Sequence, residues 1–434
     1  MMLMVIGANC MAQSGFPYCE PFTQSTTRAN TVYGGASRLT SGVEDPVGQG
    51  VLRLTPATGN QNGYAYVDIP FSSQYGIKTS FEFFMYGGNG ADGLTFFLFD
   101  AAIQNFSPGG YGGSLGYAPN NNTPGLSAGY IGIGLDVYGN YGNTIEGKTD
   151  GFTNNNTRHP NSVVIRGPQS DSYKFIKGVK TNEGGTFGLP SNQQFSLSSG
   201  GAGTQRIASP DQRGYRKANF DLQPNPNGVG YLINLSIEIN DGTNRIIEIF
   251  KNEPYPYTAP QNLKVGFAAS TGGSTNFHEI RNVIVQVSDD QNLRDPIAND
   301  KSVQACEGVE RRFEIKATED VILLNDPDNN FIRCLQLANT IADFPTDDFD
   351  ICTTEQCDSS RQQLSTPYGN FEADPEGGLI RFTPNLNTVG NEVKIFYTVT
   401  DNFGKTSVPK EIIINISAMP NPAIIQVNGG FPRP

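Results

Sequence analysis

The feature that most constrains the fold is an alternation of apolar with mostly polar residues at positions 231–239. Every second residue is apolar, namely Tyr231, Ile233, Leu235, Ile237 and Ile239. Residues two apart lie on the same face of a β-strand, so the stretch predicts a strand with one buried face. Asp241-Gly242 and a second apolar run at 245–250 follow, and this order predicts a β-hairpin.

The composition extends this prediction to the whole chain. The 434 residues include 50 glycines and 28 prolines, and no long stretch keeps a 3.6-residue apolar period. Turn residues at this density favour short strands over helices, which indicates an all-β protein. Further strand-like runs occupy 79–86, 94–99, 162–167 and 264–270. The length predicts more than one domain.

The N-terminal stretch 1–12 is apolar and places Cys10 and Ala12 three residues and one residue before Gln13. It resembles a signal peptide, although its basic segment is missing, and it predicts export. Residues 13–288 read as one large β unit, 289–296 as a polar linker, and 297–420 as a second β unit. The tail 421–434 resembles a further unit cut short. No segment reaches the ~20 apolar residues of a membrane span.

Charge and cysteine content narrow the function classes. The net charge is −12, and Lys and Arg do not cluster, which argues against a nucleic-acid partner. The four cysteines of the second unit predict two disulfides, as expected of an exported protein, but the sequence does not determine which cysteines pair. A zinc site is the alternative, but the spacing has no C-x2-C pair; the residues are Cys306, Cys334, Cys352 and Cys357.

The stretch IGIGLDVYGN at 131–140 begins as an apolar strand and ends with polar groups at every second position. Asp136, Tyr138 and Asn140 therefore leave the strand on one face. A carboxylate, a backbone carbonyl and an amide oxygen are ligands that Ca²⁺ accepts. The pattern predicts a calcium site, with an ordinary Asx-rich turn as the alternative.

Four segments together resemble the legume-type (L-type) lectins, particularly their bacterial surface relatives. They are ADGLTFFLFD at 91–100, GGSLGY at 112–117, IGIGLDVYGN at 131–140 and VGFAASTGGSTNFHEIRNV at 265–283. The resemblance implies a concanavalin-like jelly-roll β-sandwich that binds calcium and a carbohydrate at the bacterial surface or after secretion.

The resemblance also implies residue roles. Asp92, joined to Ala91 by a cis peptide bond, would accept hydrogen bonds from sugar hydroxyls. Gly113 or its neighbour Gly112 would donate a backbone N–H to the same sugar. Asn140 would bind both calcium and sugar, and Tyr138 would stack on the sugar while its carbonyl binds calcium. The loop 272–276, with Gly273 and Ser274, would tune specificity.

Two departures from the family pattern affect the metal expectation. Gly134 stands where plant members carry a glutamate, and the downstream segment 141–167 differs from theirs in length and in sequence. Glu146 and Asp150 are the candidates for a fourth calcium ligand. His159 would serve a second, transition metal, but the missing glutamate favours calcium alone.

The second unit carries ILLNDPDNN at 322–330 and FYTVTDNFGKTS at 396–407. These stretches resemble the immunoglobulin-like or cadherin-like modules that are repeated in bacterial surface proteins. The resemblance implies a smaller β-sandwich that acts as a spacer next to further surface modules.

The function expected from these patterns is non-catalytic, calcium-dependent carbohydrate binding by a lectin or adhesin. A surface scaffold with a degenerate sugar site is one alternative. A glycoside hydrolase is another, but Asp136 has no acidic neighbour on its strand to form the carboxylate pair that such an enzyme needs. The chain has only two histidines, which gives serine-hydrolase chemistry little support.

Overall fold

The computed structural model describes residues 16–28, 30–200, 203–326, 330–344, 359–374 and 378–419. The chain divides into two compact units, between Leu293 and Arg294. The segments expected to be a signal peptide, 1–12, and a terminal tail, 421–434, lie outside the described residues. Among the described residues, no helix combines the length and the apolar character needed to cross a membrane.

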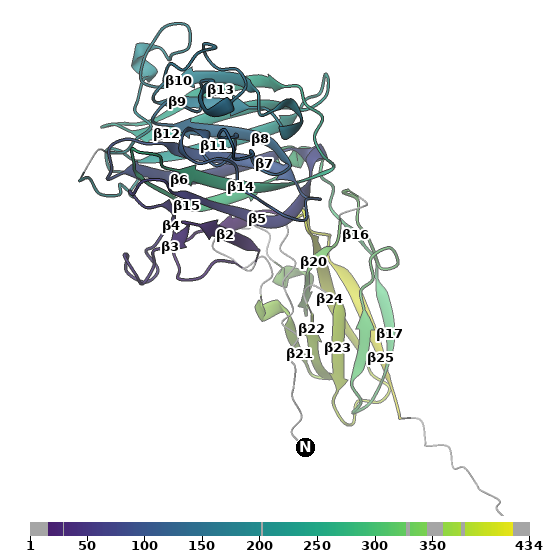
Figure 1. Ribbon diagram of the computed structural model, residues 1–434. Coiled ribbons are helices and arrows are strands. Elements are labelled where there is room, and N and C mark those ends of the chain that lie inside the picture. Colours follow the sequence, from purple (N-terminus) through teal and green to yellow (C-terminus); the bar gives the residue numbers. More distant parts are fainter. Residues whose placement is uncertain are drawn as a thin grey trace, which may run out of the picture. The chain divides into compact units, whose positions relative to one another are not determined.

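Two antiparallel sheets form the first unit (Figure 1). The first has the order β13 (Asn244–Tyr255), β12 (Tyr231–Asn240), β11 (Arg216–Pro224), β6 (Ile77–Tyr86), β15 (Phe277–Gln286), β4 (Leu52–Thr55) and β3 (Arg38–Leu39), and β1 (Tyr18–Glu20) also pairs with β15. The second has the order β10 (Phe175–Lys180), β9 (Ser162–Arg166), β8 (Gly129–Asp136), β7 (Gly93–Asp100), β14 (Asn262–Ser270), β5 (Asn62–Ser72) and β2 (Thr31–Gly35).

Aromatic side chains from both sheets meet in the core between them. Phe81 of β6 lies 4.8 Å, centroid to centroid, from Phe267 of β14, and Phe220 of β11 lies 4.7 Å from Phe96 of β7. All four side chains are buried. The two sheets therefore bury one common face, as expected for a lectin-like jelly-roll sandwich. The prediction of an all-β fold is confirmed.

The hairpin predicted at 231–250 is present. Residues 231–240 form β12, whose side chains alternate between buried and half-buried, and β13 returns beside it. Gly242 in the turn has φ +119°, a conformation that favours glycine. The register pairs Asn240 with Asn244, so the chain reverses over 241–243.

Short 3₁₀ helices connect the strands of the first unit. They span Ser73–Tyr75, Gly112–Ser114, Ile145–Gly147, Gln169–Asp171, Ser191–Gln193 and Asp290–Asn292.

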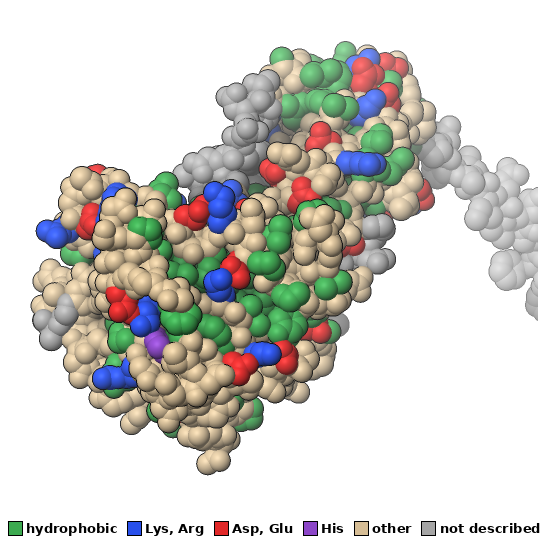
Figure 2. Space-filling view, turned by 90° about the horizontal axis from the view of Figure 1, so that it is seen from above, with side chains coloured by type: hydrophobic (Ala, Val, Ile, Leu, Met, Phe, Trp, Pro, Cys, Tyr) green, Lys and Arg blue, Asp and Glu red, His purple; other side chains and the backbone are tan. Residues whose placement is uncertain are grey.

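On the face that Figure 2 shows, Lys and Arg side chains are scattered singly among polar and apolar atoms.

The second unit is also built from strands, with a core of its own. One sheet has the order β17 (Lys301–Cys306), β25 (Lys410–Ser417), β24 (Glu392–Asp401) and β20 (Ile332–Ala338). Another has the order β18 (Arg311–Glu314), β23 (Leu379–Pro384), β22 (Gly369–Ala373) and β21 (Gln363–Thr366), and a short ribbon joins β16 (Ile297–Ala298) to β19 (Val321–Ile322). Its 3₁₀ helices are Ile341–Asp343 and Ser359–Arg361.

The cysteine expectation is wrong for one residue. Cys306 is a free thiol at the end of β17, and its sulfur lies 3.8 Å from the Ser417 hydroxyl. Cys334 in β20 is buried and is not a free thiol. Cys352 and Cys357 lie outside the described residues, so their pairing stays a prediction.

The core contacts predict the effect of removing one ring. Phe81→Ala should lower the free energy of unfolding by about 3–5 kcal/mol, because the lost ring leaves a cavity between the sheets. Urea denaturation measures the loss, and Ile246→Ala, at a side chain that is 72% exposed, is the control that should change little. Equal losses in both variants would contradict this account of the core.

Candidate functional site

Two carboxylates meet where β7 begins and β8 ends. The two strands are antiparallel, and Gly93 pairs with Asp136, so Asp92 comes directly before the residue opposite Asp136. The backbone carbonyl of Asp92 accepts hydrogen bonds from the N–H groups of Val137 and Tyr138, both at 3.0 Å. The sheet register therefore joins two segments that are far apart in the sequence. The Ala91–Asp92 peptide bond is cis.

The carboxylate of Asp136 is fully buried and holds the turn that follows β8. One oxygen accepts the Gly139 N–H and the other accepts the Tyr141 N–H, both at 2.7 Å. Burial raises the pKa of Asp136 to about 7, although these hydrogen bonds and the charge of Lys148 lower it. The turn places Asn140 next to the site.

Asp92 is 3% exposed, and its Oδ2 is buried without a hydrogen-bond partner. Burial, followed by the charges of Asp136 and Glu146, raises its pKa to about 7. A Cβ placed on Gly272 would lie 3.3 Å from this oxygen, and a backbone hydrogen bond from Gly272 to the Asp92 carboxyl lowers its pKa. A buried acceptor without a donor is rare in folded proteins and indicates a missing partner.

The glycine loop packs against the other side of the cluster. A Cβ on Gly113 would lie 2.3 Å from the Cβ of Asn140 and 3.2 Å from Oε2 of Glu146. Gly112 has φ +65°, and its carbonyl accepts a hydrogen bond from the Ser270 hydroxyl at 2.7 Å. The close approach of this loop therefore requires glycine at position 113.

The side chain of Asn140 is half-buried, and its oxygen accepts a hydrogen bond from the Asn143 amide at 3.1 Å. The ring of Tyr138 is also half-buried, and the Arg158 guanidinium lies 4.6 Å from its centre. One face of the Tyr138 ring is therefore covered by a cation within this chain. Sugar stacking on that face would require Arg158 to move aside.

A buried arginine holds the segment between Asn140 and Asp150 in place. The five N–H donors of Arg166 all reach backbone carbonyls at 2.8–3.2 Å; the acceptors are those of Tyr141, Asn143, Thr149, Asp150 and Tyr173. Its guanidinium is fully buried, and burial lowers its pKa to about 10. The sequence patterns did not identify Arg166, because its partners are main-chain atoms that carry no residue signature.

Three expected ligands fall in different surroundings. Glu146 joins the cluster, where its carboxylate pairs with the Lys148 ammonium at 2.9 Å. The Asp150 side chain is 43% exposed, and its carboxylate lies 3.7 Å from Lys174. His159 packs on the ring of Phe152 at 4.7 Å, and burial, followed by the charge of Lys180, lowers its pKa. The structure thus brings Glu146 into the cluster and directs Asp150 and His159 to other partners.

The ring of Tyr141 leaves no room for a side chain at position 134, where the sequence comparison with plant lectins expects a glutamate. A Cβ on Gly134 would lie 2.4 Å from the ring of Tyr141, which is fully buried. The aromatic ring occupies the position that a longer side chain at 134 would need. In the described part of the chain, no three acidic, imidazole or thiol side chains converge as a ready-made metal centre.

The loop between β14 and β15 borders the site and braces the segment before Asp92. The carbonyl of Thr275 accepts the N–H groups of Asn89 and Gly90, at 2.8 and 3.1 Å. Gly273 is exposed with open space around it, and Ser274 is half-buried. Both residues lie between Gly272, which approaches Asp92, and Thr275, which contacts the segment before Asp92.

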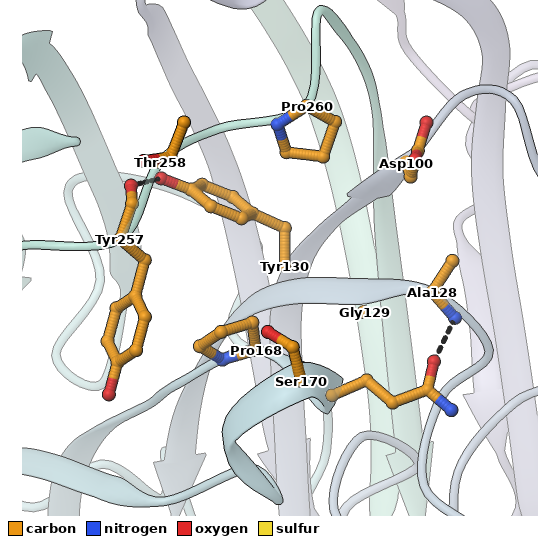
Figure 3. Close-up of a pocket in the computed structure, with 10 residues that line it drawn as sticks. Asp100, Ala128, Gly129, Tyr130, Pro168, Ser170, Tyr257, Thr258 and Pro260 are labelled. Atoms are coloured by element: carbon orange, nitrogen blue, oxygen red, sulfur yellow. Dashed lines mark hydrogen bonds between the residues drawn. The ribbon is translucent and has the colours of Figure 1, made fainter. Parts of the chain in front are cut away.

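A cavity of about 500 Å³ lies at the opposite end of β7 and β8 (Figure 3). Asp100, Tyr130 and Pro260 line it together with Pro168 and Thr258. The Tyr130 hydroxyl donates to the Tyr257 carbonyl at 2.6 Å across one wall. The register Phe99–Gly129 separates this cavity from the carboxylates by the full length of the strands, so it is not part of the candidate site.

No protein-family model and no curated protein matches the chain. Solved structures do. Peanut lectin with a nine-residue peptide is 18% identical, with 62% of this chain and 96% of that chain covered and a TM-score of 0.39. A seed lectin of Lotus tetragonolobus is 15% identical, with 62% and 97% covered and a TM-score of 0.41. The Ca²⁺/Man3GlcNAc-bound VIP36 exoplasmic/lumenal domain is 14% identical, with 60% and 87% covered and a TM-score of 0.35.

The raised pKa of Asp92 predicts a pH effect on stability. Its value rises from 3.8 to about 7 on folding, so between these values the folded state binds the additional proton. This group therefore makes the metal-free protein less stable as the pH rises. Asp92→Asn should gain stability relative to the unmodified protein as the pH rises from about 4 to about 7, by up to about 1.4 kcal/mol per pH unit, and the difference should stay constant at higher pH. Urea denaturation in EDTA measures the difference, and a difference that does not vary with pH would contradict the prediction.

Proposed function

We propose that the first unit is a non-catalytic carbohydrate-binding domain whose site is supported by calcium. The observation that carries the proposal is the buried Oδ2 of Asp92, which lacks a donor although it sits beside Asp136, Asn140 and the glycine loop. A sugar hydroxyl is a donor that would satisfy it.

The residues present suit calcium. Asp136 and Asn140 supply side-chain oxygens, and Tyr138 supplies a carbonyl from the same turn, which are the hard oxygen ligands that calcium prefers. After burial, the charges of Asp136 and Glu146 raise the pKa of Asp92, so these carboxylates repel one another and a cation among them would relieve the repulsion. When bound, calcium would neutralise these carboxylates and fix the turn.

The chain's own groups would then bind the sugar. Asp92 accepts hydrogen bonds from hydroxyl groups, and the backbone of Gly112 or Gly113 donates one. Asn140 donates from its amide nitrogen, while its oxygen faces the cation. Tyr138, Gly273 and Ser274 contact the remaining sugar surface.

The same geometry argues against hydrolysis at this site. Both oxygens of Asp136 accept backbone N–H groups, and the side chain is fully buried. A nucleophile must reach the sugar carbon of the scissile bond, and a general base must reach the proton of the attacking water. Asp136 instead shapes the turn and would supply oxygen to the cation.

The rest of the chain fits a surface role. We propose that the protein is exported by a bacterium and that the second unit is an immunoglobulin-like or cadherin-like spacer. The wider role is then that of a lectin or adhesin that presents the sugar site away from its attachment point.

A glycan array on the whole protein tests the function. Binding should appear in calcium and disappear in EDTA, and Asp92→Asn should abolish it, because an amide cannot replace both acceptor oxygens. Asp100→Asn, at the other end of the same strand, is the matched control and should bind normally. Folded protein that binds no glycan in either condition would rule out the proposal, and binding that survives EDTA would remove calcium from it.

The glycine loop gives a second test. Gly113→Ala should weaken glycan binding at least tenfold, since its methyl group would lie 2.3 Å from the Asn140 side chain and displace it. Gly228→Ala, where the nearest atom is 3.4 Å away on a flexible asparagine, should leave binding unchanged. Unchanged affinity in Gly113→Ala would place the sugar elsewhere.

A further inference from the structure

A lysine ammonium lies inside the carboxylate cluster. Lys148 follows the 3₁₀ helix Ile145–Gly147, and its side chain has no exposed area. Its Nζ lies 2.9 Å from Oε2 of Glu146. A buried ammonium without a paired anion is strongly unfavourable, so this ion pair is needed to keep the lysine charged.

The partner of Lys148 supports the glycine loop. Oε2 of Glu146 also accepts a hydrogen bond from the Ser114 hydroxyl at 3.4 Å, and the Glu146 carbonyl accepts the Asn121 N–H at 2.7 Å. Glu146 has φ +66°, so its backbone adopts an uncommon conformation to make these contacts. The lysine thus holds, through Glu146, the loop that contains Gly112 and Gly113.

The positive charge of Lys148 also acts on the other carboxylates. Burial lowers the pKa of Lys148, and the charges of Glu146 and Asp136 oppose that shift. Burial raises the pKa of Asp92 and of Asp136, and the charge of Lys148 opposes both of those shifts. Arg166 is the other buried cation nearby, but its five donors are all occupied by carbonyls. Lys148 is therefore the cation whose charge is paired with a carboxylate of the cluster.

We infer that Lys148 is a built-in cation of the candidate site, which keeps Glu146 out of the calcium ligand set and lowers the affinity of the site for calcium. This inference rests on the proposed function only in placing calcium at Asp136 and Asn140. It assigns Lys148 a positioning role: the ammonium supports the glycine loop in the metal-free protein and repels the divalent ion that shares its carboxylates.

Calorimetric titration with Ca²⁺ tests this role on the whole protein. Lys148→Met should bind calcium about tenfold more tightly or better, because one nearby positive charge is removed. It should also unfold at a lower temperature in EDTA and gain more from calcium than the unmodified protein. Glu146→Gln should have the opposite effect on affinity, since it removes a negative charge and leaves Lys148 free to pair with Asp136.

Lys174→Met is the matched control. Its lysine pairs with the exposed Asp150 at 3.7 Å, so its calcium affinity should stay unchanged. Equal or weaker calcium binding by Lys148→Met would overturn the inference. If Lys148→Met folds only in calcium, the inference is supported. If it folds in neither condition, Glu146→Gln decides, and affinity that is unchanged or tighter there overturns the inference.

Glycan binding by the same samples reports on the proposed function separately. Opposite shifts in calcium affinity with no glycan binding would reject the sugar site and retain the role of Lys148. Glycan binding that is lost in EDTA, together with equal calcium affinity in all variants, would retain the sugar site and reject the role of Lys148.

Discussion

Gly93 of β7 pairs with Asp136 of β8, and the candidate site depends on this register. It sets the backbone of Asp92 against the turn after β8, where the Asp92 carbonyl accepts two N–H groups. A shift of one residue would turn every side chain of β8 to the other face. The buried side chains of β8 and their neighbours in β7 and β9 hold the register, so core packing fixes the position of the polar cluster.

The cost of gathering buried carboxylates is met by backbone and cationic groups. Asp136 is satisfied by two N–H groups, Glu146 by Lys148, and the carbonyls of the following segment by Arg166. Asp92 keeps one oxygen without a donor. The cluster is thus stable enough to persist in the folded chain and remains incomplete at one atom, which is the property expected of a binding site.

Much of the local structure could be predicted from the sequence. The period-2 pattern at 231–239 and the Asp241-Gly242 turn gave the β12–β13 hairpin, and the apolar runs at 79–86 and 94–99 became β6 and β7. The resemblance also predicted the cis bond before Asp92, which the structure contains. These features depend on neighbours in sequence or on a motif, so they can be read without the fold.

Other residues required the tertiary structure. Glu146 and Asp150 were equal candidates in the sequence, but only Glu146 meets Lys148 under the glycine loop, while Asp150 faces Lys174. His159 went to an aromatic cluster, and Cys306 has no sulfur partner. No sequence pattern identified Lys148 or Arg166. The role of Lys148 comes from its burial beside Glu146, and that of Arg166 comes from backbone carbonyls that other segments supply.

The sequence by itself determined the class of fold and the strand that ends in Asp136, Tyr138 and Asn140, and the resemblance of its motifs to a known family supplied the candidate Asp92. Alternation and turn chemistry are properties of adjacent residues. The tertiary structure decided which charges share one buried volume, because the pairing of strands brings together residues that are tens of positions apart. The charge balance among Asp92, Asp136, Glu146 and Lys148 exists only after that pairing.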